Sequence, residues 1–91
     1  MQGKLISRNV TVGGHRTSLR LEGATWAAMD QICAVESYSI HELCTIIERY
    51  RHGSSRTSMV RAFIVTYFRT VANAGGAMEG GVLPQLIAQA E

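Results

Sequence analysis

Residues 15–22 alternate between two kinds of side chain, and this pattern most restricts what the chain can fold into. At its centre one row is polar (Arg16, Ser18 and Arg20) and the other is mainly apolar (Thr17, Leu19 and Leu21). A period of two predicts a β-strand with one face against a core and the other in water. Arginine and serine donate hydrogen bonds to base edges and phosphates, so the side chains on the solvent-exposed face are suited to bind nucleic acid.

A single strand leaves its backbone hydrogen-bonding groups without partners. No other stretch alternates as clearly, although residues 9–12 are compatible with a short extra strand and Gly13-Gly14 with a flexible joint. The simplest partner is therefore the same strand of a second copy, antiparallel across a two-fold axis near Ser18. We expect an obligate homodimer whose helices bury Leu19 and Leu21 from behind.

Three helices are predicted after the strand. The first spans about residues 23–36, with Trp26 as a core anchor. The second begins after Ser39, because Ser39 and Glu42 have the spacing of a capping box, and it ends near His52-Gly53. The third runs from Ser54 or Ser55 to about residue 73 and has a wide apolar face, which is explained nearly as well by burial within one chain as by contact with a second subunit. We thus expect a mainly α fold with one N-terminal strand.

Charge and glycine content divide the 91 residues into a basic arm (1–14), a domain (15–74) and a flexible tail (75–91). Residues 1–20 contain four basic residues and no acid, a net charge of +4. Residues 21–91 contain five basic and seven acidic residues, a net charge of −2. Because the positive charge lies in the arm and the strand, these are where nucleic acid is expected to bind, with Lys4 and Arg8 adding mainly non-specific attraction to phosphates.

Several other classes of protein are disfavoured. Cys33 and Cys44 both fall on apolar helix faces and are expected to be core thiols, with a disulfide or metal pair as the minor alternative. The three histidines (His15, His41 and His52) match no compact metal site, and we expect neither a metal nor a cofactor. An enzyme would need a nucleophile–base pair or a carboxylate cluster, and the sequence suggests neither, so catalysis is not expected.

The longest apolar run, residues 62–68, is too short to span a bilayer, so a soluble cytoplasmic protein is expected.

The order of a polar-faced strand and two helices, the second capped by serine, resembles the ribbon–helix–helix DNA-binding family (the Arc/MetJ/CopG superfamily). The stretch Gly14–Glu22, with Trp26 four residues on, is similar to one bacterial branch of these small domains. The resemblance covers about residues 8–72. It implies that Arg16, Ser18 and Arg20 enter the major groove and contact bases. It also implies that the start of the second helix binds a phosphate, a role that falls on Ser39, Ile40 and His41.

This sequence departs from the family pattern in three places. Gly23-Ala24 replaces the usual proline and acid, Ser37-Tyr38 replaces a glycine-containing loop, and a break at residues 52–54 divides what is a single helix in the simplest members. The break leaves the placement of the third helix open.

Two functions follow from these patterns. The first is a dimeric, sequence-specific protein that binds double-stranded DNA, expected to be a transcriptional repressor, with higher oligomers on DNA left open. The second is an antitoxin-like or adaptor protein that holds a protein partner through residues 54–91. Salt-dependent binding to duplex DNA by the purified protein would favour the first.

Overall fold

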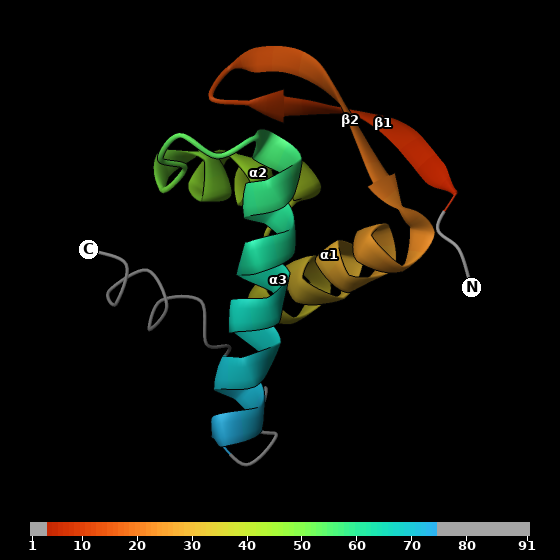
Figure 1. Cartoon of the computed structure of the whole chain (residues 1–91). Coiled ribbons are helices and arrows are strands. Elements are labelled where there is room, and N and C mark those ends of the chain that lie inside the picture. The colour runs from red at the N-terminus through yellow and green to blue at the C-terminus, as the bar shows by residue number, and fades with distance from the viewer. Residues whose placement is uncertain (1–3, 75–91) are drawn as a thin grey trace.

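The computed structural model describes residues 4–74 and contains two strands followed by three helices (Figure 1). Their bounds are β1 Leu5–Val12, β2 His15–Glu22, α1 Gly23–Glu36, α2 Ile40–Arg49 and α3 Arg56–Asn73. This confirms the predicted class, a mainly α fold with an N-terminal ribbon and three helices. The proposed tail, residues 75–91, lies outside the described residues.

The second strand of the ribbon does not come from where we expected it. β2 pairs with β1 of the same chain, antiparallel, with Val12 opposite His15 and Leu5 opposite Glu22. Gly13 and Gly14 join the strands with φ angles of 57° and 87°, as a two-residue hairpin turn requires. The expectation that the chain itself supplies no partner strand is therefore wrong, whereas the pairing of β2 with a second copy stays a prediction. The expected short strand at residues 9–12 is an eight-residue strand, and most of the expected arm belongs to the sheet.

The two faces of the hairpin differ in the way that the alternation of β2 predicted. Leu19 and Leu21 are buried, and Val10 and Val12 of β1 lie beside them on the same face. These four side chains form the roof of the hydrophobic core. The opposite face of the hairpin is turned to solvent, because alternate residues of a strand point to opposite sides.

The helices lie beneath the hairpin and complete the core (Figure 1). α2 packs against β1, whereas α1 and α3 contact β2. Trp26 is buried, as predicted, and its Nε1–H donates to the carbonyl oxygen of Ile6 at 2.8 Å. Deeper in the core, the Tyr67 hydroxyl of α3 donates to the Glu36 carboxylate at the end of α1 at 2.6 Å. The largest fully buried side chains come from every element: Val10, Leu21, Met29, Ile32, Leu43, Val60 and Tyr67.

The start of α2 has the capping box that the sequence predicted. The Ser39 hydroxyl accepts from the Glu42 amide at 3.0 Å, and the Glu42 carboxylate accepts from the Ser39 amide at 2.8 Å. α3 begins in a similar way, with the Ser55 hydroxyl accepting from the Ser58 amide. In the loop before α2, Ser37 adopts a left-handed conformation with φ of 64°. A serine therefore occupies the conformation for which glycine is usual at a helix end.

The break between α2 and α3 is held by a cluster of three charged residues. Glu48 accepts hydrogen bonds from Arg51 at 2.7 Å and from Arg56 at 2.9 Å. These bonds lower the pKa of the Glu48 carboxyl from 4.5 to about 2. Gly53 makes the turn with φ of 80°. The cluster fixes the direction in which α3 leaves α2.

Both cysteines are free thiols, with Cys44 buried and Cys33 half-buried. Burial raises the pKa of Cys44 to about 11, so this thiol stays protonated near neutral pH. Within residues 4–74, no helix has the length and apolar content needed to cross a membrane.

Candidate nucleic-acid interface

The solvent face of the hairpin carries two parallel rows of polar side chains. In β2, Arg16, Ser18 and Arg20 are exposed, as expected from the alternation. The second row comes from β1 and was missed by the sequence analysis. The register places Thr11 opposite Arg16, Asn9 opposite Ser18, and Ser7 opposite Arg20. One chain thus presents six hydrogen-bonding side chains on one face of a two-stranded ribbon.

Most donors on this face remain available. Ser7 and Ser18 share a hydrogen bond of 2.7 Å between their hydroxyls, and Arg16 Nη1 lies 3.5 Å from Thr11 Oγ1. Arg20 and Asn9 have no hydrogen bond or ion pair with another side chain in the described part of the protein. The ribbon therefore offers arginine and amide groups that are free to bind a ligand.

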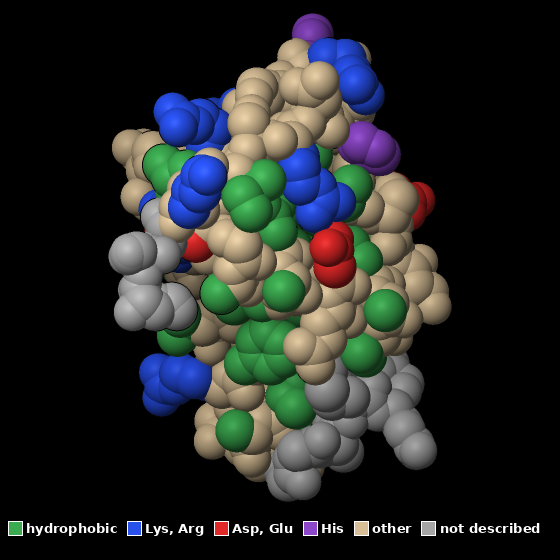
Figure 2. Space-filling view, turned by 90° about the vertical axis from the view of Figure 1, so that its right-hand side faces the viewer, with side chains coloured by type: hydrophobic (Ala, Val, Ile, Leu, Met, Phe, Trp, Pro, Cys, Tyr) green, Lys and Arg blue, Asp and Glu red, His purple; other side chains and the backbone are tan. Residues whose placement is uncertain are grey.

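The one acid on the solvent face, Glu22, lies at the end of β2 and is neutralised. Its carboxylate is 3.0 Å from Arg61 Nη2 and also accepts from the Thr25 hydroxyl. Together with a backbone hydrogen bond, these contacts lower the pKa of Glu22. Figure 2 shows Lys and Arg side chains gathered mainly over the upper part of the molecule, where the hairpin lies. The field over this face is consequently positive.

Lys4 and Arg8 of the N-terminal arm were both expected to attract phosphates, but they lie in different environments. Lys4 is exposed just before β1. Arg8, in contrast, belongs to the row that faces the helices, in register with Leu19. Its guanidinium lies over the Trp26 ring and 3.3 Å from Asp30. Arg8 is therefore separated from the solvent face by the sheet itself.

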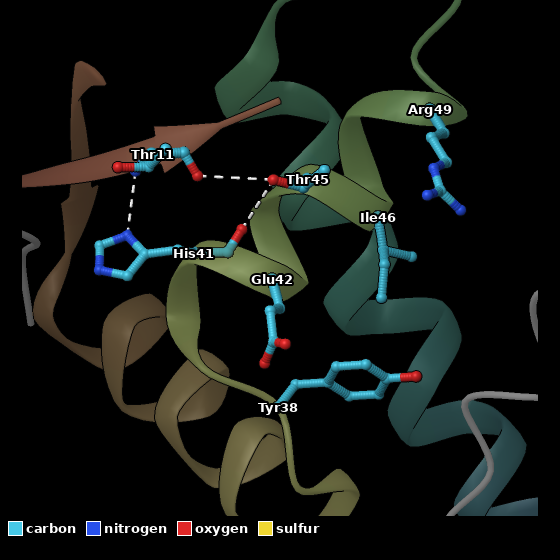
Figure 3. Close-up of a pocket in the computed structure, with 7 residues that line it drawn as sticks. All are labelled: Thr11, Tyr38, His41, Glu42, Thr45, Ile46 and Arg49. Carbon is cyan, nitrogen blue, oxygen red and sulfur yellow. Dashed lines mark hydrogen bonds between the residues drawn. The ribbon is translucent and has the colours of Figure 1, made fainter. Parts of the chain in front are cut away.

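The start of α2 lies against the outer edge of β1, near the hairpin turn (Figure 3). Ser39 is exposed and its hydroxyl is used by the capping box, whereas Ile40 is half-buried and can offer only its backbone N–H outward. His41 is half-buried against β1, and its Nδ1 accepts from the Thr11 amide at 3.0 Å. The structure thus brings the three residues expected to bind a phosphate to the flank of the ribbon.

Comparison with known protein families gave a match to the ribbon–helix–helix domain over residues 5–68. The chain belongs to the ribbon–helix–helix family. Members of this family are DNA-binding regulators rather than enzymes, which gives the general kind of function of this protein. The match begins at the first residue of β1, so it includes both strands of the hairpin. Comparisons with curated proteins and with solved structures gave no match.

Proposed function

We propose that this ribbon–helix–helix protein is a sequence-specific transcriptional repressor that inserts the solvent face of its hairpin into the major groove of double-stranded DNA. The observation that carries the proposal is the pair of polar rows, free of unpaired acid, on a two-stranded ribbon. The major groove accommodates a ribbon of this width. Arg16, Ser18 and Arg20 contact bases, since arginine can bind guanine through two hydrogen bonds and serine can donate or accept.

Contacts to the DNA backbone flank this reading face. Lys4 supplies an exposed positive charge, and the start of α2 supplies the free amides of Ile40 and His41 beside the ribbon. Ser39 holds these amides in place through its capping box. Arg8 takes no part, because its guanidinium is on the helix side of the sheet against Trp26 and Asp30.

The two edges of the hairpin favour a homodimer formed through β2. In a hairpin closed by a two-residue turn, hydrogen-bonded and non-hydrogen-bonded pairs alternate from the turn outward. The backbone groups of Arg16, Ser18 and Arg20 therefore point away from β1, and no described residue of the chain pairs with them. Antiparallel pairing of two β2 strands about Ser18 satisfies these groups. It places two copies of the three base-contacting residues side by side at the centre of the sheet.

The test of this function is selection of bound duplexes from a randomised DNA pool, followed by titration against a selected and a scrambled site. Enrichment of a symmetric motif and tighter binding to the selected site support the proposal. Affinity that falls steeply with salt for both duplexes, with no difference between them, would leave only non-specific binding. Sedimentation at micromolar concentration measures the dimer separately, and a folded monomer there would exclude it.

A second function, binding of a protein partner, is favoured by one observation. α1 and α3 form a groove of about 280 Å³ that is lined largely by small and apolar residues. Val65, on its rim, has 59% of its surface exposed. Co-purification of a stoichiometric partner, lost on Val65→Asp, would support an adaptor or antitoxin-like role. Retained partner binding in this variant would place the contact elsewhere.

A further inference from the structure

Ser7 of β1 and Ser18 of β2 share a hydrogen bond on the solvent face of the hairpin. Their hydroxyl oxygens are 2.7 Å apart, and either hydroxyl can be the donor. Both residues are exposed, and they are diagonal neighbours on the two strands, since Ser18 is in register with Asn9. A serine hydroxyl has one hydrogen to donate and two lone pairs that accept. The direction of this bond therefore decides which of the two serines keeps a hydrogen for a ligand.

The proposed pairing of two β2 strands places the two serines at different distances from the centre of the major groove. Neighbouring strands lie about 4.8 Å apart, so each β2 is about 2.4 Å from the two-fold axis and each β1 about 7 Å from it. The major groove is about 12 Å wide, so its walls stand about 6 Å from the axis of a ribbon that lies along it. Ser18 consequently faces the base edges, whereas Ser7 faces the sugar–phosphate backbone.

We infer that Ser7 donates to a backbone phosphate of the bound DNA and thereby makes Ser18 an acceptor toward the base that it contacts. The inference rests on the proposed function and on pairing through β2. Phosphate oxygens only accept hydrogen bonds, so a serine that binds one must donate its single hydrogen. Ser18 then donates to Ser7 across the 2.7 Å contact. Both hydrogens are thus used, and only lone pairs of Ser18 remain for the base.

A serine that can only accept distinguishes bases by their exocyclic groups. In the major groove, adenine presents an N6 amine and cytosine an N4 amine, whereas guanine and thymine present carbonyl oxygens at the corresponding places. Ser18 should therefore prefer adenine or cytosine on the DNA strand that it contacts. Without the bond to Ser7, the Ser18 hydroxyl could also donate to a carbonyl oxygen, and this preference would be lost.

The inference assigns a role to a strand that the family resemblance leaves without one. The resemblance implies contacts by the outward residues of β2 and by the start of α2, and none by β1. Ser7 is instead a specificity-determining residue that touches no base, because it acts through the hydroxyl of Ser18.

Four variants separate this effect from a simple backbone contact. Ser18→Ala identifies the base position, which is the one whose preference disappears. Ser7→Ala should release the Ser18 hydrogen, so that guanine or thymine is accepted at that position. Ser7→Thr keeps a hydroxyl and should keep the wild-type preference. Thr11→Val is the matched control, because it removes another hydroxyl of the β1 row, one that lies 3.5 Å from Arg16 Nη1.

Base analogues in the selected duplex test the direction of the bond in the wild-type protein. Purine deoxyriboside lacks the N6 amine of adenine, and a 2-pyrimidinone deoxyriboside lacks the N4 amine of cytosine. Relative to Ser18→Ala, loss of the amine should weaken wild-type binding about three- to tenfold. 7-Deaza-adenine lacks the purine N7 acceptor and should cause no such loss. Circular dichroism checks that each variant is folded.

The results divide as follows between the inference and the proposed function. Acceptance of the carbonyl base by Ser7→Ala, with rejection retained in Ser7→Thr and Thr11→Val, supports the inference. An unchanged preference in Ser7→Ala, or a wild type that depends on N7 instead of the amine, overturns it while specific binding stands. A Ser18→Ala variant that keeps every preference does the same. Failure of the wild-type protein to prefer any selected duplex overturns the proposed function and the inference together.

Discussion

The guanidinium carbon of Arg8 lies 4.4 Å from the centre of the Trp26 ring, which places a basic residue of the ribbon inside the packing of the domain. Arg8 Nη1 is also 3.3 Å from a carboxylate oxygen of Asp30 in α1. The ring is buried while the ion pair is at the surface. Arg8 therefore covers the aromatic core residue with its guanidinium, which also pairs with Asp30 at the boundary with water.

Arg8→Ala should lower stability and leave DNA binding by the folded protein unchanged. The loss comes from the cation–π contact and the covered Trp26 surface, and we expect about 1 kcal/mol in urea unfolding. Arg69→Ala, which removes an exposed arginine from α3, should change stability by much less. A specific loss of DNA affinity in folded Arg8→Ala would return this residue to the phosphate contacts.

Ser39→Ala should destabilise the protein by roughly 1 kcal/mol, because the Glu42 amide loses its acceptor at the start of α2. The free amides beside the ribbon should also become less ordered, so DNA affinity should fall further than the stability loss explains. Thermal unfolding and DNA titration measure the two effects. Ser54→Ala, an exposed serine outside both helix caps, should leave both quantities unchanged. An unaltered melting temperature for Ser39→Ala would contradict the stabilising role of the capping box.

Arg16→Ala and Arg20→Ala should each reduce the preference for the selected site by about 1–3 kcal/mol per lost base contact. The fold should be unaffected, since both side chains are on the solvent face. Circular dichroism checks folding, and titration against selected and scrambled duplexes measures specificity. Lys4→Ala should instead weaken both duplexes equally and lower the salt slope by about one. If the arginine variants stay folded and still prefer the selected site, base reading must be assigned to the helices.

Glu48→Gln should remove part of the acid sensitivity of the fold. The pKa of Glu48 is lowered from 4.5 to about 2 by Arg51 and Arg56. A depressed folded-state pKa stabilises the protein above the unfolded value, and this stabilisation disappears as the pH falls through the folded value. Between pH 4.5 and about 2, the wild type should therefore lose stability more steeply than Glu48→Gln. Urea unfolding across this range measures the difference, and parallel curves would show that the cluster does not contribute.

The helices could be predicted from the sequence because their ends are encoded locally. Ser39 and Glu42 mark the start of α2 by their spacing alone, and α1 begins and ends at the residues expected. The length of β1 was underestimated because the sequence does not show which residues pack against it. Arg8 interrupts the apolar row formed by Ile6, Val10 and Val12, and only the positions of Trp26 and Asp30 explain why a charge is tolerated there.

Part of the candidate site could also be predicted from local sequence patterns, and part depends on tertiary structure. Alternation alone predicted that Arg16, Ser18 and Arg20 share a solvent face, because a strand has only two sides. The second row, Ser7, Asn9 and Thr11, follows from the register of the hairpin, which depends on the turn at Gly13-Gly14. The hydrogen bond that joins His41 to β1 depends on which ring nitrogen meets the Thr11 amide. That orientation is set by the packing of α2 on β1, which sequence spacing does not contain.

The contacts of His41 with the Thr11 amide and of Thr45 with the Gly13 amide also affect how far this sheet can grow. Exposed strand edges are templates for further pairing, and a sheet that is open at both edges can extend into a filament. Here His41 and Thr45 occupy the outer edge of β1 near the turn, so β2 is the edge left for another strand. When two β2 edges pair, each end of the enlarged sheet is a β1 strand that is bound by its own α2 near the turn. We therefore expect assembly through the ribbon to stop at a pair of chains and not to continue into a fibre.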